Sequence, residues 1–310
     1  MSAPDRTERA RGHTDIRADD WIARRLPRPF RPYCRIARLD RPIGWWLLLW
    51  PCWWSVALAS DGWPSPPLLA AFLLGAVVMR AAGCCWNDIA DREYDGRIER
   101  TRTRPIPAGE ISVLQAGLFM AALALVGLAV LLGFNSFAIA VGIASLGPVV
   151  VYPFMKRITW WPQLFLGIAF NWGALLGWAA VRGSLDGPAL ALYLGGIAWT
   201  LGYDTIYAHQ DKEDDALVGL RSSALRLGEA TRPALYAFYA LALLGFGWAG
   251  LAAGLHWAFG LGFLVAAGQL AWQVARLKLD DPADCLAKFK SNTLFGWLLF
   301  AAIIAGRVLA

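Results

Sequence analysis

Charged side chains are scarce in this sequence. Asp, Glu, Lys and Arg make up 17% of its 310 residues, whereas hydrophobic residues make up 57% and the mean hydropathy is +0.45. A soluble domain of this length could not hide so much apolar surface from water. The composition therefore excludes an ordinary soluble protein and predicts an integral membrane protein.

The residue patterns of several common enzyme classes are also missing. The sequence has only three histidines and five cysteines, and the cysteines form no Cys-x-x-Cys pair and no ligand set with the histidines. It contains no glycine-rich phosphate loop, no Ser/His/Asp arrangement and no dinucleotide fingerprint. Any chemistry therefore has to come from carboxylates, a metal ion and Arg or Lys. We expect the thiols to be free and packed as small apolar groups.

Long apolar runs are plentiful, and they predict the fold. Nine runs of about 17 to 22 residues are each long enough to cross a hydrocarbon core of about 30 Å. They cover 43–60, 66–86, 113–133, 135–155, 161–181, 187–208, 233–254, 256–277 and 293–309. The sequence therefore predicts an all-α bundle of nine transmembrane helices.

Basic residues are distributed unevenly between the loops. They crowd the N-terminal segment and the loops after the second, fourth, sixth and eighth runs, and are almost absent from the opposite loops. By the positive-inside rule this pattern predicts a cytoplasmic N-terminus. We therefore expect a protein integral to the cytoplasmic (inner) membrane, with its active site facing the cytoplasm.

The N-terminal segment differs from the rest of the chain, because it is rich in Arg and has no long apolar run. Residues 1–32 are expected to form a basic, partly disordered cytoplasmic arm on the anionic membrane surface, and residues 33–310 the transmembrane domain. Trp21, Ile22 and Leu26 could enter the interface as a short amphipathic helix. The charged segment is too long for a cleaved signal peptide, and a nucleic-acid partner is not expected.

An acidic cluster follows the second apolar run. On a helix, Asn87, Asp88, Asp91 and Asp95 fall within about 100° of arc, so three carboxylates and an amide share one face. Such a face repels itself unless cations lie on it, and Mg²⁺ prefers carboxylate, water and phosphate oxygens. The spacing favours a Mg²⁺–phosphate site. The alternative is a solvated helix end.

A second acidic cluster follows the sixth run. Asp204, Asp211 and Asp215 fall within about 40° of one another on a helix. Two acidic faces that both end apolar segments favour a functional pair, because ionisable residues at such places are costly and usually functional. We expect Asp211 and Asp215 to hold a second Mg²⁺. His209 points about 140° away from Asp204 on a continuing helix, so it is better read as a surface or loop residue.

Basic residues lie close to both clusters. Arg100 and Arg104 follow the first cluster in a loop that ends in Pro and Gly, and Lys156 follows Tyr152 and Pro153. Arginine forks suit diphosphate and carboxylate oxygens. The alternative is that these charges only set the topology.

These residues together resemble the UbiA family of membrane prenyltransferases, and specifically its 4-hydroxybenzoate branch. The resemblance runs from about residue 33 to the C-terminus, and the long Arg-rich arm lies outside the family pattern. The matching motifs are Arg38-Leu39-Asp40-Arg41-Pro42-Ile43-Gly44, Asn87-Asp88-x-x-Asp91-x-x-x-Asp95, Arg100-Thr101 through Arg104-Pro105, Tyr203-Asp204-Thr205-x-Tyr207-Ala208-x-x-Asp211-Lys212-x-Asp214-Asp215, and Phe289-Lys290-Ser291-Asn292.

The resemblance implies a central cavity, open laterally to lipid, in which a polyprenyl group moves from its diphosphate to 4-hydroxybenzoate. The transfer is to the ring carbon ortho to the hydroxyl, as in ubiquinone biosynthesis, with Mg²⁺ assisting ionisation of the donor. An apolar tunnel would hold the isoprenoid, and four aromatic residues are candidates for its wall. They are Phe165, Phe170, Trp172 and Trp178.

Within this interpretation the candidate residues take separate roles. The first acidic cluster and the pair Asp211 and Asp215 would each hold one Mg²⁺. The substrate-binding residues would be Arg41, Arg100, Arg104, Tyr152 and Lys156. Asp204 precedes Asp211 by about 10 Å along the helix, so it would lie deeper and act as general base on the phenol. Alternatively it is a third metal ligand or a hydrogen-bond partner of Tyr152.

Other functions stay open at this point. Within the family, haem precursors or other quinone precursors could be the acceptor. A CDP-alcohol phosphotransferase would carry an Asp-x-x-Asp-Gly-x-x-Ala-Arg motif, which is absent. An anion transporter would use the arginines for binding and the acids for coupling ions.

Overall fold

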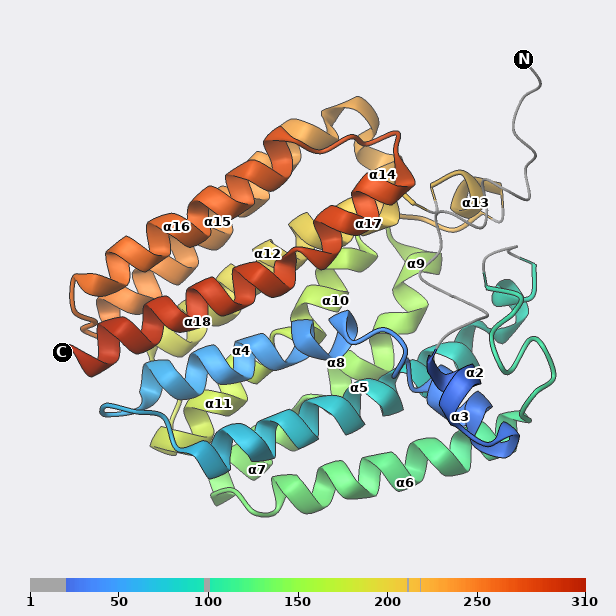
Figure 1. Ribbon diagram of the computed structural model, residues 1–310, viewed down its shortest axis with the longest axis horizontal. Coiled ribbons are helices and arrows are strands. Elements are labelled where there is room, and N and C mark those ends of the chain that lie inside the picture. The colour runs from blue at the N-terminus through green and yellow to red at the C-terminus, as the bar shows by residue number, and fades with distance from the viewer. Residues whose placement is uncertain (1–20, 98–100, 211, 218) are drawn as a thin grey trace.

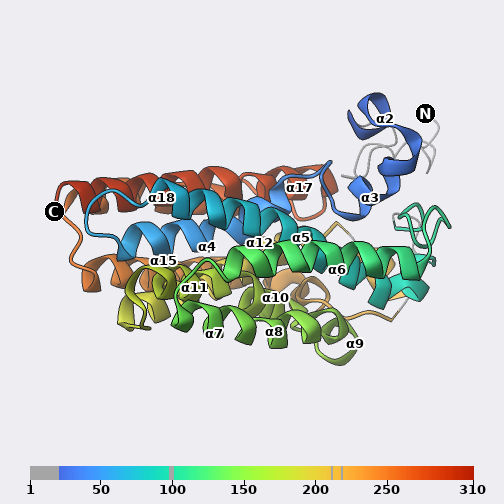
Figure 2. The same ribbon diagram turned by 90° about the horizontal axis from the view of Figure 1, so that it is seen from below.

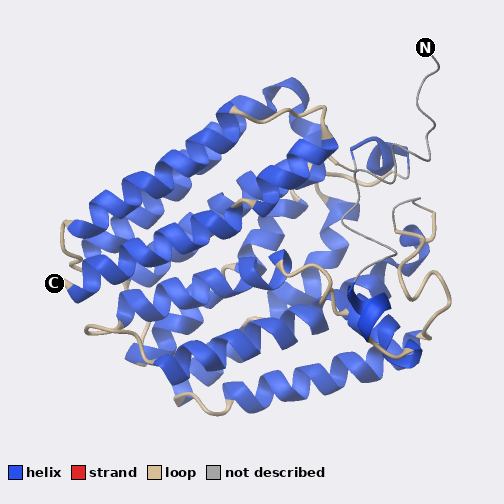
Figure 3. Ribbon diagram, viewed as in Figure 1, coloured by secondary structure: helices blue, strands red, loops and turns tan. Residues whose placement is uncertain are grey.

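The computed structural model describes residues 21–97, 101–210, 212–217 and 219–310, and every regular element within these ranges is a helix (Figure 1, Figure 3). In chain order the helices are α2 (Trp21–Arg25), η1 (Arg28–Phe30), α3 (Arg31–Ile36), α4 (Ile43–Ala59), α5 (Pro66–Asp95), α6 (Val113–Leu131), α7 (Ser136–Ala144), α8 (Leu146–Val151), η2 (Tyr152–Phe154), α9 (Met155–Ile158), α10 (Pro162–Phe170), α11 (Trp172–Arg182), α12 (Gly187–Ala208), α13 (Lys212–Leu217), α14 (Ser223–Leu227), η3 (Gly228–Ala230), α15 (Thr231–Ala252), α16 (Ala258–Ala275), α17 (Pro282–Lys290) and α18 (Asn292–Val308).

The predicted apolar runs all coincide with helices in the described ranges. Seven of these helical segments are long and apolar enough to cross a membrane: Pro66–Asp95, Val113–Leu131, Ser136–Ile158, Pro162–Arg182, Ser223–Ala252, Ala258–Ala275 and Pro282–Val308. The other two runs correspond to α4, which is apolar but has 17 residues, and to α12, which has 22. The all-α membrane fold is confirmed, and the count of nine spans stays a prediction.

Much of the predicted N-terminal arm lies outside the described residues. Within them, α2 forms where the short interfacial helix was expected, and its Ile22 is buried. Ile36 at the end of α3 packs in one apolar cluster with Cys85 of α5 and Ala116 of α6. This cluster fastens the α3 segment to the bundle. The boundary between residues 32 and 33 stays a prediction.

Two of the predicted spans are broken in the middle. One is divided into α7 and α8 at Ser145, whose hydroxyl donates to the Gly142 carbonyl at 2.6 Å. The other is divided into α10 and α11 at Asn171, whose amide donates to the Gly167 carbonyl at 2.9 Å and the Thr200 hydroxyl at 2.8 Å. Within a bilayer a break needs such partners, because no water is there to bond freed backbone groups.

Helices α12 and α15 pack closely together. A Cβ atom built on Gly245 would lie 2.7 Å from the Gly195 Cα atom, so the two backbones touch. Small residues commonly allow such close approach between membrane helices. The pair is therefore held rigidly, and α12 carries Asp204 four residues before its last residue, Ala208.

A different kind of contact joins α4 to α18. The ring centroids of Trp50 and Trp297 are 4.8 Å apart, and those of Trp53 and Phe300 are 5.5 Å apart. Gly296 lies against the Trp50 ring, so that ring has room to enter the seam. Aromatic rings in edge-to-face and tilted contact therefore fill the space between these two helices.

Both acid-bearing helices reach the same end of the bundle. In Figure 1, α3 and α13 lie at the right-hand end, whereas the C-terminal end of α18 lies at the left. Figure 2 shows α6 on the outer face, beside α5. The polar residues of the site therefore gather at one end, and the apolar body of the bundle extends away from them.

Candidate active site

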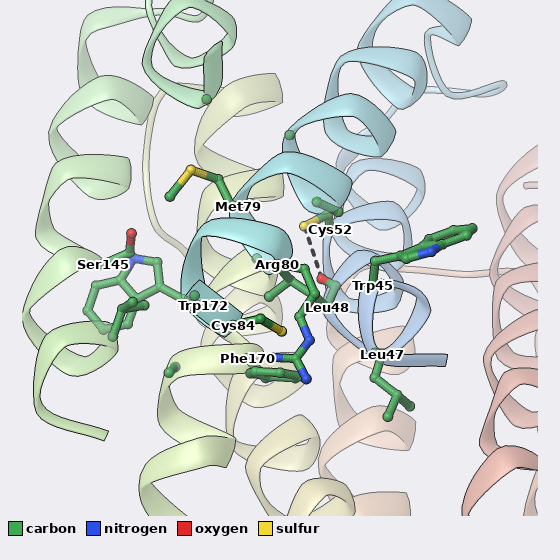
Figure 4. Close-up of a pocket in the computed structure, with 18 of the residues that line it drawn as sticks. Trp45, Leu47, Leu48, Cys52, Met79, Arg80, Cys84, Ser145, Phe170 and Trp172 are labelled. Atoms are coloured by element: carbon green, nitrogen blue, oxygen red, sulfur yellow. Dashed lines mark hydrogen bonds between the residues drawn. The ribbon is translucent and has the colours of Figure 1, made fainter. Parts of the chain in front are cut away.

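A cavity of about 780 Å³ opens between the helices. Figure 4 shows part of its wall, with Arg80 beside Phe170. Most of its wall consists of apolar side chains from α4 to α11. The charged, amide and phenol side chains in its wall are those of Arg38, Arg41, Arg80, Asn87, Asp88, Arg104, Tyr152, Tyr203, Asp204 and Tyr207.

The three acids of the first cluster share one face of α5, as the sequence predicted. Asp88, Asp91 and Asp95 are all buried. A buried carboxylate is costly unless it is paired and hydrogen-bonded. Each of the three is paired with at least one cation.

Asp88 is bound by two arginines from distant parts of the chain. The Arg38 guanidinium donates to both of its carboxylate oxygens, at 2.7 and 3.0 Å. Arg104 donates through Nη1 to Asp88 at 3.1 Å and to Asp95 at 2.6 Å, so it bridges two acids one helical turn or more apart. The predicted basic loop therefore does reach the predicted acidic face.

Asp91 is bound by a second group of donors. Lys156 Nζ lies 2.6 Å from its Oδ2 atom, and Arg157 Nη2 donates to its Oδ1 atom at 3.1 Å. Asn87 donates its amide to the same carboxylate at 3.1 Å. The short segment around α9 thus also covers the acidic face.

The ion pairs of this cluster compete with metal binding for the same carboxylates. Among the described residues, no group of three or more His, Cys, Asp or Glu side chains converges as a ligand set. The donor types fit a hard divalent cation, because carboxylate and amide oxygens are its preferred ligands. Three carboxylates face four cations, Arg38, Arg104, Lys156 and Arg157, so these cations have to turn away before a metal can bind. The assignment of Mg²⁺ to Asn87 and the three acids stays a prediction.

Arg80 lies deeper in the cavity, in the middle of α5. Its guanidinium lies over the Phe170 ring, 5.1 Å from the ring centre (Figure 4). Its Nε atom is buried and has no hydrogen-bond partner among the described residues. Asp204, on α12, also lines the cavity and interacts electrostatically with Arg80. A cation and a carboxylate therefore face the same apolar space.

The other predicted site residues divide into two groups. Arg41 and Tyr152 line the cavity, and Arg41 also bonds Asp40 at 2.9 Å. Arg100 and Asp211 lie outside the described residues, and Asp215 lies on α13 without a described side chain. The proposed second metal site therefore stays a prediction.

A smaller polar chamber of about 200 Å³ adjoins the main cavity. It shares Asn87, Arg104, Tyr152, Asp204 and some neighbours with the main cavity. Lys156, from α9, and Arg221, from the loop before α14, add positive charge to its wall. Asp204 therefore borders both spaces.

His209 takes no part in this site. Its ring is buried and bonds the Thr231 hydroxyl at 3.2 Å, away from both cavities. The expectation that it does not face Asp204 agrees with this position. It is, however, an interior residue and not a surface one.

Sequence reasoning overlooked three cations of the site. The sequence marked Arg38 only as part of a motif. In the structure its backbone φ is 58°, which is unusual for a residue other than glycine. From the sequence, Arg157 had no role of its own, although it bonds Asp91 in the structure. Arg80 could have been found, because an arginine within an apolar run is a functional candidate by default.

The predicted aromatic wall is partly present. Phe170 and Trp172 line the cavity. Trp178 instead packs in the core, where its indole N–H donates to Asp186 at 2.8 Å. Phe165 is not among the lining residues.

Comparison with known proteins identifies the family of this chain. The UbiA prenyltransferase family matches residues 48–301. A mitochondrial 4-hydroxybenzoate polyprenyltransferase of Arabidopsis thaliana is 46% identical over 295 residues, which cover 94% of this chain and 72% of that protein. The mitochondrial enzyme of the same name from Bos taurus is 47% identical over 290 residues, covering 93% and 78%.

Solved structures share the fold. A UbiA homologue from Aeropyrum pernix K1, in its apo form, has a TM-score of 0.67 and 26% identity, covering 85% of this chain and 97% of that one. A UbiA homologue from Archaeoglobus fulgidus, bound to GPP and Mg²⁺, has a TM-score of 0.64 and 21% identity, covering 88% and 99%. That homologue has also been solved with Cd²⁺, so it binds divalent metals.

The relatives correct one expectation from the sequence. They are mitochondrial enzymes, so the assignment to the cytoplasmic (inner) membrane of a cell, with the site facing the cytoplasm, is wrong. An integral membrane location is supported. The positive-inside rule compares the two sides of a membrane and carries no information about which membrane it is.

Proposed function

The chain belongs to the UbiA family of prenyltransferases, and we propose that it catalyses the reaction for which its relatives are named. It transfers a polyprenyl group from polyprenyl diphosphate to the ring carbon ortho to the hydroxyl of 4-hydroxybenzoate, in ubiquinone biosynthesis. Residues 33–310 form the catalytic domain. One observation carries this conclusion: an apolar cavity has acids and cations at a single end. A donor with one anionic end and a long apolar chain needs such a cavity.

The diphosphate binds at the polar end. Four cations oppose three carboxylates there, so the cluster has an excess of positive charge before any substrate enters. Arg104 and Lys156 turn from the carboxylates to the phosphate oxygens, since charge-assisted bonds to phosphate are strong. Arg38 and Arg157 can do the same. Arg41 and, from the loop outside the described residues, Arg100 add further donors.

The carboxylates that these cations release become available for metal. Asp88, Asp91 and Asp95, with Asn87, would hold one Mg²⁺, and Asp211 and Asp215 a second. The donor chemistry supports this assignment. When bound, Mg²⁺ neutralises the negative charge that grows on the diphosphate as its bond to the allylic carbon breaks.

The acceptor binds deeper, between Arg80 and Asp204. 4-Hydroxybenzoate carries a carboxylate and a phenol at opposite ends of its ring. Arg80 binds the carboxylate, because its guanidinium lines this space beside Phe170 and supplies positive charge there. Asp204 accepts the phenol proton, and Tyr152 borders the same space.

The reaction then balances around these residues. Loss of the phenol proton to Asp204 raises the electron density of the ring carbon beside the oxygen. That carbon forms a bond to the allylic carbon whose bond to diphosphate breaks. The ring proton leaves, aromaticity returns, and Asp204 gives its proton back to the oxygen, so diphosphate and one proton are the by-products.

The test is an assay with membranes that contain the protein. Mg²⁺, a polyprenyl diphosphate and a panel of phenolic acids are added, and products are identified by mass. We expect prenylated 4-hydroxybenzoate, and none from membranes with the Asp91→Asn variant at equal abundance. Prenylation of a different acceptor alone would contradict the assignment. Uptake of an anion into vesicles without any product would indicate the transporter instead.

A further inference from the structure

A glycine of α4 borders the Arg80 side chain inside the cavity. Gly44 is the second residue of α4 and the last residue of the motif that begins at Arg38, and it lines the cavity together with Arg80. A Cβ atom built on Gly44 would lie 2.7 Å from Arg80 Nε, 3.2 Å from Nη2 and 3.4 Å from Cζ. Real Cβ atoms essentially never come within 3.0 Å of another heavy atom. The guanidinium can therefore lie here only because residue 44 has no side chain.

These distances also show which part of the guanidinium faces α4. The Cβ position is closer to the two nitrogens than to the carbon that joins them, so it lies beside the edge formed by Nε and Nη2. This contact accounts for Arg80 Nε, which is buried and bonds no described residue. The guanidinium also lies over the Phe170 ring of α10, with 5.1 Å between Cζ and the ring centre. The backbone of α4 and an aromatic ring of α10 therefore both fix the position of the cation.

The break between α10 and α11 places Phe170 in this contact. Phe170 is the last residue of α10, and Asn171 at the break donates its amide to the Gly167 carbonyl and the Thr200 hydroxyl. A Cβ atom on Gly196 of α12 would collide with Asn171 Oδ1, so the close packing of α12 also depends on a glycine. Segments far apart in the sequence therefore converge on one guanidinium.

We propose that Gly44 is a positioning residue for the acceptor. By leaving room for Arg80 against α4, it holds the edge formed by Nη1 and Nη2 where the acceptor carboxylate binds. This inference rests on the proposed function. A carboxylate and a guanidinium pair through two parallel N–H···O bonds, so the pair depends on the exact position of the cation. Gly44 therefore contributes to the choice of an anionic acceptor over a neutral phenol.

The variant Gly44→Ala tests this role. Its methyl group would displace only the flexible end of the Arg80 side chain, and alanine suits a helix better than glycine, so the fold should persist. We expect kcat/KM for 4-hydroxybenzoate to fall about tenfold or more, because a displaced guanidinium loses a charge-assisted bond. For 4-hydroxybenzamide, which has no carboxylate, kcat/KM should change by less than about twofold. The Michaelis constant for the donor should stay near the wild-type value.

A double variant separates this role from a structural one. In the Arg80→Met background, Gly44→Ala should cause no further loss, because the guanidinium that its methyl group displaces is already gone. An equal loss in both backgrounds would mean that Gly44 serves α4 itself, and would overturn the proposal. The matched control is Gly83→Ala. Gly83 also lines the cavity, but its Cβ would meet nothing within 4 Å, so this variant should keep the wild-type preference for the carboxylate.

A binding measurement gives an answer that does not depend on turnover. Labelled 4-hydroxybenzoate is dialysed to equilibrium against the full chain in nanodiscs, for the wild type and for Gly44→Ala. Weaker binding by Gly44→Ala supports the proposal even if the wild type prenylates nothing, in which case the proposed function alone fails. Equal binding by the two proteins, or no binding by the wild type, overturns the proposal. If the wild type still prenylates 4-hydroxybenzoate, the proposed function then stands without it.

Discussion

The guanidinium of Arg80 lies 5.1 Å from the centre of the Phe170 ring, inside the cavity and away from the acidic cluster. The ring occupies one face of the cation and fixes its plane. The edge of the guanidinium therefore remains for a ligand, and the acceptor carboxylate fits it.

Replacing Arg80 should impair the acceptor and not the donor. In Arg80→Met we expect kcat/KM for 4-hydroxybenzoate to fall about a hundredfold, since truncating one partner of a buried charge pair costs about 2 to 5 kcal/mol. The Michaelis constant for the donor should change little. Steady-state kinetics with each substrate varied in turn would show the difference. Arg182→Met, which removes the exposed pair with Asp61 at 2.7 Å, is the control. Equal damage to both substrates would argue against a carboxylate site.

Arg104 should require its arginine fork. Its Nη1 atom alone bonds both Asp88 and Asp95. In the proposed donor complex the planar guanidinium binds phosphate oxygens through two N–H groups, which a lysine cannot reproduce. In Arg104→Lys we expect kcat/KM for the donor to fall about tenfold or more, by loss of about 1.4 kcal/mol or more. Arg102→Lys changes an exposed residue of the same loop and should be near neutral. Unchanged kinetics in Arg104→Lys would mean that its charge serves topology only.

Replacing Asp204 should slow the chemical step and leave substrate binding nearly unchanged. The Asp204→Asn variant should bind Mg²⁺ and donor nearly as the wild type does, yet prenylate about 10² to 10⁴-fold more slowly, as expected for loss of a general base. Donor binding and ring prenylation are measured separately in nanodiscs. Asp91→Asn is the comparison, because it should lose donor binding. If both variants lose donor binding to the same degree, Asp204 belongs to the metal site.

Removing divalent metal should stop turnover without unfolding the protein. The buried acids are already neutralised by Arg38, Arg104, Lys156 and Arg157, so we expect the melting temperature to shift by less than about 3 °C on chelation. Activity should vanish with chelator and return with Mg²⁺. Turnover that resists chelation would contradict the metal assignment. Unfolding on chelation would show that the cations do not stabilise the acidic face.

His209 should make the protein sensitive to acid. Burial, and secondly nearby Lys212, lower the pKa of His209 to about 4. Its unfolded pKa is about 6.5, so the unfolded state binds the proton first as the pH falls. The contribution of His209 to stability is therefore full above pH 6.5 and is lost between about pH 6.5 and 4, by up to about 3 kcal/mol. Melting curves of His209→Gln across this range should be flatter than those of the wild type. Parallel curves would contradict the prediction.

Much of the fold follows from periodicity and length. The apolar runs gave helix positions close to those observed, and the spacing of Asp88, Asp91 and Asp95 placed them on one helix face. Both depend on residues near in sequence. The breaks at Ser145 and Asn171 were missed, because a broken helix and a continuous one share the same apolar composition.

The partners of the site were harder to predict. Arg38 reaches Asp88 across fifty residues of sequence, and nothing local links the two. Arg80 and Asp204 lie on the wall of one cavity, and that placement likewise depends on the tertiary arrangement of α5 and α12. The residue types predicted a charged site. Only the tertiary structure shows that Arg and Lys side chains already form ion pairs with its three carboxylates.

The contact between Gly195 and Gly245 makes the reaction depend on atoms far from it. Asp204 is nine residues beyond Gly195, or about 14 Å along α12. A single methyl group added at Gly245 would lie 2.7 Å from the Gly195 Cα atom and would push α12 aside. If α12 tilts, the displacement is largest at the end of the helix, near Asp204. In a mutational scan, such a substitution would therefore resemble the loss of a catalytic group, although it lies in an apolar contact between two helices.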